Sequence, residues 1–245
     1  MGAIYDPVAI LVFMRFLESL DNRNFSNGMA EIIKMGLIRD SQLLKLLFTH
    51  NTESLRKPEN AEQLQKIIQI SMECKLEVVE HDKYEGGLRK ILNFGHTIGH
   101  GVEFASNEKL LHGESVSVGM VLALQLQIQK AQSKERLLSA ELNPRHEDKA
   151  NERARWTELL EKTKQILGQY NLPTQIPTFL EHNRIIELMK GDKKKTENHE
   201  FQFVFVEEEG KAYEHTWPVS EDEVRQVISN QVLIEFMPKE LKSQE

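Results

Sequence analysis

Residues 86–103 read GGLRKILNFGHTIGHGVE and combine a helical pattern with an unusual set of polar side chains. If the segment is a helix, one face carries Arg89, Asn93, His96, His100 and Glu103, at successive spacings of 4, 3, 4 and 3. The opposite face is apolar and carries Leu88, Ile91, Leu92, Ile98 and Val102. Gly95 and Gly99 each weaken a helix by about 1 kcal/mol relative to alanine but allow close backbone approach. We predict a helix over 88–104 that carries a functional site.

The composition favours a folded, mainly helical chain. Of 245 residues, 40% are hydrophobic and 28% are charged, which is enough apolar material for a buried core. Glycine and proline number 13 and 7, a smaller share than the roughly 12% of ordinary proteins, so turn-rich β-architectures are disfavoured. Cys74 is the single cysteine and excludes an internal disulfide, which indicates a reducing compartment and a cytoplasmic location.

Charge and hydropathy exclude two classes of partner. The formal net charge of −7 argues against a general nucleic-acid binder, whose affinity comes from lysine and arginine on phosphates. No apolar run approaches the roughly 20 residues that span a bilayer, and the N-terminus lacks a signal-peptide pattern. We therefore expect neither nucleic acid nor membrane as a partner.

Apolar periodicity predicts the other elements. Helices are expected over 27–48 with Ser26 or Asn27 as N-cap, and over 60–79, 115–131 and 156–170. A last helix over 220–232 should open with a capping box of Ser220 and Glu223. The run 8–13 suggests a buried strand or a helix start, and 201–206 with 211–217 suggests one small β-hairpin. The stretch 132–156 is a charged insertion, and 239–245 is a frayed tail.

Histidines and one glutamate suggest a metal site. His96 and His100, at i and i+4, can bind one metal ion from adjacent helical turns, although two ordinary exposed histidines give the same pattern. His112 and Glu31 add candidate ligands, and a catalytic metal takes three protein ligands and an open position. Spacing alone leaves open which histidines bind. Glu31 and Lys34, at i and i+3, can equally form an ordinary ion pair.

Basic residues suggest an anionic substrate. Lys34, Lys75, Arg89 and the run Lys193, Lys194 and Lys195 can supply charge-assisted donors to a phosphate or carboxylate. A solvated turn is the alternative explanation for the lysine run.

Four segments together resemble the 3-dehydroquinate synthase family. They are NGMAEIIK at 27–34, the segment 87–100, LHGE at 111–114 continuing to Gly119 and Met120, and the triplet Asp192-Lys193-Lys194. The resemblance implies a multi-helix C-terminal domain over 1–245, with 1–24 as a junction remnant. Family members carry an N-terminal NAD-binding α/β domain ahead of this part, and no glycine-rich phosphate-binding turn of that kind occurs in this sequence.

The resemblance also assigns residues. It makes Glu31, His96 and His112 the ligands of zinc or cobalt, with both histidines also beside the substrate. It makes Glu85 and His100 acid/base groups that act with Lys34, Arg89 and Asn93 in catalysis. Substrate contacts would come from Lys34, Lys75, Arg89, Asn93, Lys193 and Lys194. Residual contacts to NAD would come from Phe16, Ser19, Leu20 and Asn27.

The implied reaction converts 3-deoxy-D-arabino-heptulosonate 7-phosphate, a small phosphorylated keto acid, to 3-dehydroquinate and phosphate in the shikimate pathway. A homodimer is the expected assembly. Another sugar phosphate cyclase, of the deoxy-inosose or valiolone type, is one alternative. A non-catalytic metal-binding remnant is another, and the related iron-dependent alcohol dehydrogenases fit less well because they tend to have Asp where Glu31 stands.

Overall fold

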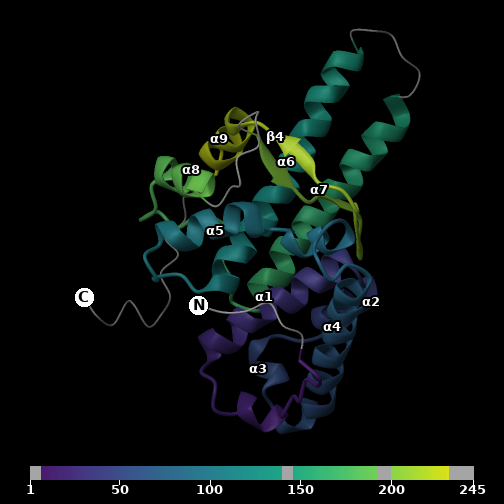
Figure 1. The fold of residues 1–245 in the computed structure, drawn as a ribbon, viewed down its shortest axis with the longest axis vertical. Coiled ribbons are helices and arrows are strands. Elements are labelled where there is room, and N and C mark those ends of the chain that lie inside the picture. The colour runs from purple at the N-terminus through teal and green to yellow at the C-terminus, as the bar shows by residue number, and fades with distance from the viewer. Residues whose placement is uncertain (1–6, 140–145, 192–199, 232–245) are drawn as a thin grey trace.

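The structure is a computed structural model and describes residues 7–139, 146–191 and 200–231. It is mainly helical with a little β-structure, so the predicted fold class is confirmed (Figure 1). In the first half lie η1 (Met14–Leu17), α1 (Asn22–Ile38), α2 (Ser41–Phe48), α3 (Thr52–Leu55), η2 (Pro58–Asn60), α4 (Ala61–His81), η3 (Leu88–Asn93) and α5 (His96–Ala105). After these follow α6 (His112–Ser139), α7 (His146–Gln169), α8 (His182–Gly191), β1 (Phe201–Phe203), β2 (Val206–Glu208), β3 (Lys211–Ala212), β4 (Trp217–Val219) and α9 (Glu221–Ser229).

Helix α6 lies at the centre of the fold. It packs against α1, α5, α7 and α9, while α1 packs on α2 and α4, and α5 packs on α8 (Figure 1). The side chains of Val116, Val121 and Leu126 are fully buried, as expected for a helix that is apolar all round. The C-terminal end of α6 and the N-terminal end of α7 extend side by side away from the other helices (Figure 1). The predicted charged insertion falls on these helix ends, and residues 140–145 lie outside the described part.

The predicted helix over 27–48 is two helices. It begins earlier than expected, because Asp21 and not Ser26 or Asn27 caps α1 by accepting a hydrogen bond from the backbone of Asn24. It ends at Ile38, and the Asp40 side chain then caps α2. The predicted helix 60–79 is confirmed as α4, and the Ser220 and Glu223 capping box is present on α9.

The prediction of one helix over 88–104 is wrong. Residues 88–93 form the 3-10 helix η3, and α5 starts only at His96. Gly95 between them has φ +78°, a left-handed conformation that ends the continuous helical stripe. This break places His96 at the first turn of α5.

The glycines allow α5 and α6 to cross at very short range. A methyl group on Gly95 would lie 2.6 Å from Cγ of Met120, and one on Gly99 would lie 3.1 Å from Cα of Val116. A methyl group on Gly119 would overlap the carbonyl oxygen of Gly95. The contact therefore depends on the absence of side chains on both helices.

The predicted β-hairpin is present, but its ladder is interrupted, so that two short antiparallel pairs of strands form in place of two continuous strands. β2 pairs with β3 around Gly210, but β1 pairs with β4, with Phe201 opposite Val219. Residues 203–206 are all buried, which breaks the alternation expected for one continuous strand. The register of the β2–β3 ladder also shifts between Val206 and Glu208.

The prediction that residues 8–13 form a buried strand or a helix start is wrong. Val8, Ile10, Leu11, Val12 and Phe13 are exposed and belong to no helix or strand. Within the described ranges, no helix is both long and apolar enough to span a bilayer. The predicted tail 239–245 lies outside the described residues.

We expect Gly119→Ala to lower the free energy of unfolding by about 1–3 kcal/mol, since the added methyl group overpacks a backbone contact. Gly168→Ala on α7 is the matched control, because no atom lies within 4 Å of the added methyl group. It should leave stability unchanged or raise it by about 0.5–1 kcal/mol. Urea unfolding of both variants measures the difference, and equal midpoints would contradict the proposed close crossing.

Candidate functional site

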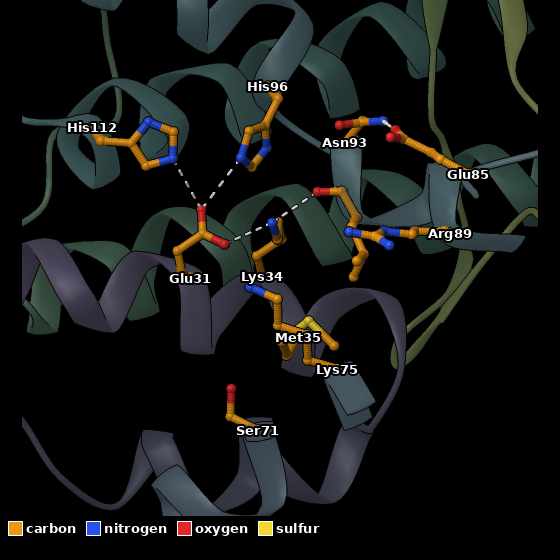
Figure 2. A pocket seen from close by; sticks show the side chains of 11 residues that line it. Glu31, Lys34, Met35, Ser71, Lys75, Glu85, Arg89, Asn93, His96 and His112 are labelled. Atoms are coloured by element: carbon orange, nitrogen blue, oxygen red, sulfur yellow. Dashed lines mark hydrogen bonds and ion pairs between the residues drawn. The ribbon is translucent and has the colours of Figure 1, made fainter. Parts of the chain in front are cut away.

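Three ligand-type side chains from three helices converge on one point (Figure 2). Glu31 lies on α1, His96 is the first residue of α5 and His112 is the first residue of α6. Oε1 of Glu31 lies 3.4 Å from Nε2 of His96 and 3.5 Å from Nε2 of His112. Ligand atoms around a tetrahedral zinc ion, each about 2.0–2.2 Å from the metal, are separated by about 3.4 Å. The spacing therefore matches a shared ion.

Both histidines direct Nε2 at Glu31 because their other ring nitrogen is engaged. Nδ1 of His96 lies 3.1 Å from the carbonyl oxygen of Phe94, and Nδ1 of His112 lies 2.9 Å from Oε2 of Glu103. A proton on Nδ1 donates to these acceptors, so the neutral ring carries its lone pair on Nε2. Metal-ligating histidines are held in this way.

One oxygen of Glu31 has no hydrogen bond within the usual distance. Oε1 is buried and has no hydrogen bond among the described residues, although Oε2 lies 2.7 Å from Nζ of Lys34. A buried carboxylate oxygen left without a partner costs free energy. A divalent cation bound by Oε1 and the two Nε2 atoms would remove that cost. One carboxylate and two imidazoles fit zinc or cobalt and leave an open coordination position.

The protonation equilibria of the three side chains differ. Burial by itself would raise the pKa of Glu31, but interactions with His112, Lys34 and His96 hold that pKa far below its usual value. Burial, followed by the nearby Lys34 cation, lowers the pKa of His96 to about 4. The carboxylates of Glu31 and Glu103 on either side of its ring raise the pKa of His112 to about 9. A metal would bind the ionised Glu31 and neutral His96 directly and would displace a proton from His112.

The three residues form part of the wall of a cavity of about 470 Å³, a size suited to a small molecule. Its other walls carry three basic side chains, and three further polar and two apolar residues: Lys34, Lys75, Arg89, Ser71, Glu85, Asn93, Met35 and Leu92. Lys34 is only 3% exposed and donates to the carbonyl oxygen of Leu92 at 2.8 Å. The basic residues suit an anionic ligand.

Asp82, which the sequence analysis missed, organises the loop that carries Glu85 and Arg89. Its carboxylate accepts hydrogen bonds from the backbone N–H groups of Gly87, Gly86 and Arg89 at 2.7–2.9 Å, and these bonds lower its pKa. Within this loop, Glu85 has a left-handed backbone conformation with φ 59°. Its side chain accepts a 2.7 Å hydrogen bond from the side chain of Asn93. An Asp followed by Gly-Gly four residues later was the available turn signal.

His96 and His100, the pair at i and i+4, do not belong to the same group of possible metal ligands among the described residues. The rings of His96 and His100 meet edge to face, with centroids 5.3 Å apart. His100 instead groups with Glu103 and His112, whose ligand atoms all lie within 4.8 Å. It does not line the described part of the 470 Å³ cavity.

The residues implied for NAD lie in two places. Phe16, Ser19 and Leu20 are exposed on and after η1, outside the lining of the cavity. The side-chain oxygen of Asn27 accepts a 2.6 Å hydrogen bond from the backbone of Gly113, next to His112. Lys193 and Lys194 lie outside the described residues.

A second contact between α1 and the start of α6 also escaped the sequence analysis. Arg23 forms two hydrogen bonds, of 2.7 and 2.8 Å, with the carboxylate of Glu114, which is only 3% exposed. Glu114 also accepts a hydrogen bond from the backbone of Leu111 at 2.8 Å. Together with Asn27, this pair fixes the first turn of α6, and thus His112, against the helix that carries Glu31.

Comparison with known families identifies this domain type. Residues 28–143 match the family model "3-dehydroquinate synthase C-terminal". A 3-dehydroquinate synthase of Prochlorococcus marinus (strain MIT 9312) is 36% identical over 86% of this chain and 52% of its own length. One of Streptococcus pyogenes serotype M49 is 32% identical over 81% of this chain and 49% of its own length. The resemblance to the C-terminal part of these enzymes is confirmed, and the chain spans about half the length of these curated relatives.

Solved structures share the fold. A 2-deoxy-scyllo-inosose synthase complexed with carbaglucose-6-phosphate, NAD+ and Co2+ matches 89% of this chain and 55% of its own, with 21% identity and a TM-score of 0.65. The 2-epi-5-epi-valiolone synthase of Streptomyces hygroscopicus, with NAD+ and Zn2+ bound, matches 88% of this chain and 53% of its own. Its identity is 23% and its TM-score 0.65.

We expect Arg23→Met to lower the free energy of unfolding by about 3 kcal/mol, because the buried carboxylate of Glu114 loses its counter-charge. Arg184→Met is the control, since Arg184 pairs with Glu187 and both side chains are exposed. That change should cost less than about 0.5 kcal/mol. Urea unfolding compares the two variants, and similar losses would disprove the special role of the Arg23 contact.

Proposed function

We propose that this chain supplies the metal- and substrate-binding part of a sugar phosphate cyclase. Specifically, we assign it to 3-dehydroquinate synthase, which converts 3-deoxy-D-arabino-heptulosonate 7-phosphate to 3-dehydroquinate and phosphate. The observation that carries the proposal is Oε1 of Glu31, which is buried without a hydrogen bond and faces Nε2 of two histidines beside a cavity with basic walls. The names of the two curated relatives described above favour this cyclase over the inosose and valiolone types.

Glu31, His96 and His112 would hold the zinc or cobalt ion. When bound, such an ion acts as a Lewis acid that makes a substrate hydroxyl more acidic and polarises a ketone. Lys34 stays next to this centre because Glu31 and the carbonyl oxygen of Leu92 accept two of the three hydrogen bonds that its ammonium group can donate. The third N–H is available for a substrate oxygen.

Lys75 and Arg89 would bind the phosphate and carboxylate of the substrate. One end of the Arg89 guanidinium donates to the carbonyl oxygen of Lys83 at 2.9 Å, which holds the side chain at the cavity. The planar guanidinium retains donors for bidentate binding of an anion. Lys193 and Lys194 would add contacts, as the resemblance implies. Holding both charged groups reduces the entropic barrier to reaction by several kcal/mol.

Proton transfer would involve Glu85 and His100. Asn93 donates to Oε1 of Glu85, so the second carboxylate oxygen is open to a substrate proton, while Asn93 can bind a substrate hydroxyl. The ring centroid of His100 lies 5.3 Å from that of His96 and 6.0 Å from that of His112. This position beside the metal ligands supports an acid/base role for His100.

Phe16, Ser19 and Leu20 would contribute contacts to NAD, because their side chains are exposed and open to a ligand. Asn27 fits a supporting role better, since its side-chain oxygen is already bonded to Gly113. These four residues include no glycine-rich phosphate-binding turn. The homodimer that the resemblance implies and the predicted cytoplasmic location belong to the same proposal.

The metal site has a direct test in the metal content of the purified protein. We expect one equivalent of zinc in the wild type and at least 100-fold weaker binding in His96→Ala and His112→Ala, because each change removes a ligand. His215→Ala, which removes an exposed histidine outside the group, should bind like the wild type. Unchanged zinc content in both ligand variants would refute the site.

The reaction is tested by phosphate release from the seven-carbon substrate with NAD and zinc added. The proposal expects release that Arg89→Leu reduces at least tenfold, since the substrate anion loses a donor. Release from a deoxy-inosose or valiolone precursor instead would favour the alternative cyclases. Zinc binding without release from any of these substrates would favour a non-catalytic metal-binding remnant.

A further inference from the structure

Glu103 contacts His112 on the side of the imidazole ring opposite Glu31. It lies on α5, two helical turns after His96, and its Oε2 is 2.9 Å from Nδ1 of His112. Nε2 of the same ring lies 3.5 Å from Oε1 of Glu31. The imidazole of His112 is therefore held between two carboxylates, one on the metal side and one behind it.

The two histidines differ in how their rings are held. The His96 side chain is 14% exposed, and its Nδ1 has the neutral carbonyl oxygen of Phe94 as acceptor. The His112 side chain is 41% exposed, so packing restrains its ring far less. A hydrogen bond to an ionised carboxylate is about twice as strong as one between neutral groups. Glu103 thus supplies to His112 the orientation that burial supplies to His96.

We propose that Glu103 is a positioning residue for the metal centre. Its carboxylate accepts the Nδ1 proton of His112, which fixes the tautomer with the lone pair on Nε2 and directs that atom at the ion. Its negative charge also makes Nε2 a stronger donor to a cation, a role that carboxylates behind metal-bound histidines commonly have. The inference rests on the proposed metal site and adds a residue to it.

The same atoms allow one competing arrangement. His100, Glu103 and His112 could hold a cation of their own, because their ligand atoms lie within 4.8 Å. We favour the positioning role because the 2.9 Å separation of Nδ1 and Oε2 is that of a hydrogen bond. The two arrangements predict different numbers of bound ions.

The test compares Glu103→Ala and Glu103→Gln with Glu108→Gln. Glu108 is an exposed carboxylate five residues after Glu103 and belongs to neither group of possible metal ligands. Zinc affinity is measured by chelator competition, and the Co²⁺-loaded proteins are compared by visible absorption. We expect Glu103→Ala to bind zinc about 10–100-fold more weakly and to change the Co²⁺ spectrum. Glu103→Gln should fall between it and the wild type, because an amide oxygen still accepts the proton but has no charge. Glu108→Gln should match the wild type.

The outcomes separate the inference from the proposed function. Wild-type protein that binds no metal refutes the metal site itself. Wild-type binding with unchanged affinity and spectrum in Glu103→Ala refutes only the role of Glu103. Two zinc equivalents in the wild type, of which Glu103→Ala loses the weaker, would assign these residues to a second ion and overturn the proposal. If Glu103→Ala does not fold, Glu103→Gln, which preserves the size of the side chain, provides the same comparison.

Discussion

The crossing of α5 and α6 at Gly95, Gly99 and Gly119 sets the positions of the metal-type ligands. A Cβ atom on Gly119 would overlap the backbone of Gly95, so the two helices approach to a distance that side chains would prevent. Each helix begins with a histidine of the group, His96 on α5 and His112 on α6. The packing of two glycine-bearing helices thus brings together two residues that are sixteen positions apart in the sequence.

A third helix completes the arrangement. Helix α1 carries Glu31, and it is joined to the first turn of α6 by Asn27 and Arg23, one and two helical turns before Glu31. These contacts lie close to the ligands, so a small change in the seating of α6 on α1 would change the separation of Glu31 and His112. Outside this triad, Asp82 organises the loop with Glu85 and Arg89 through three backbone hydrogen bonds. Binding groups are therefore held by backbone and side-chain contacts between packed helices.

The sequence predicted the helices better than their breaks. Periodicity located α4 and the buried part of α6, because burial imposes the helical pattern directly. It missed the break at Gly95, since a glycine in a helical pattern does not reveal a positive φ. It merged α1 with α2 because apolar residues recur at helical spacing on both sides of Asp40. Residues 8–13 are apolar but exposed, which hydropathy cannot indicate. For the site, spacing left His100 open as a ligand, and the resemblance selected His112. Glu103 lay on the predicted polar face and Asp82 preceded a Gly-Gly turn signal, but neither pattern indicated which residue they contact, and Arg23 carried no motif.

The central claim is that Glu31, His96 and His112 bind one divalent ion. Crystals grown with zinc, with data collected at the zinc absorption edge, test this claim most directly. The account predicts one anomalous peak about 2.0–2.2 Å from Oε1 of Glu31 and from Nε2 of both histidines. An ion bound by His100, Glu103 and His112 while Glu31 remains without a metal, or no ordered ion at all, would contradict it.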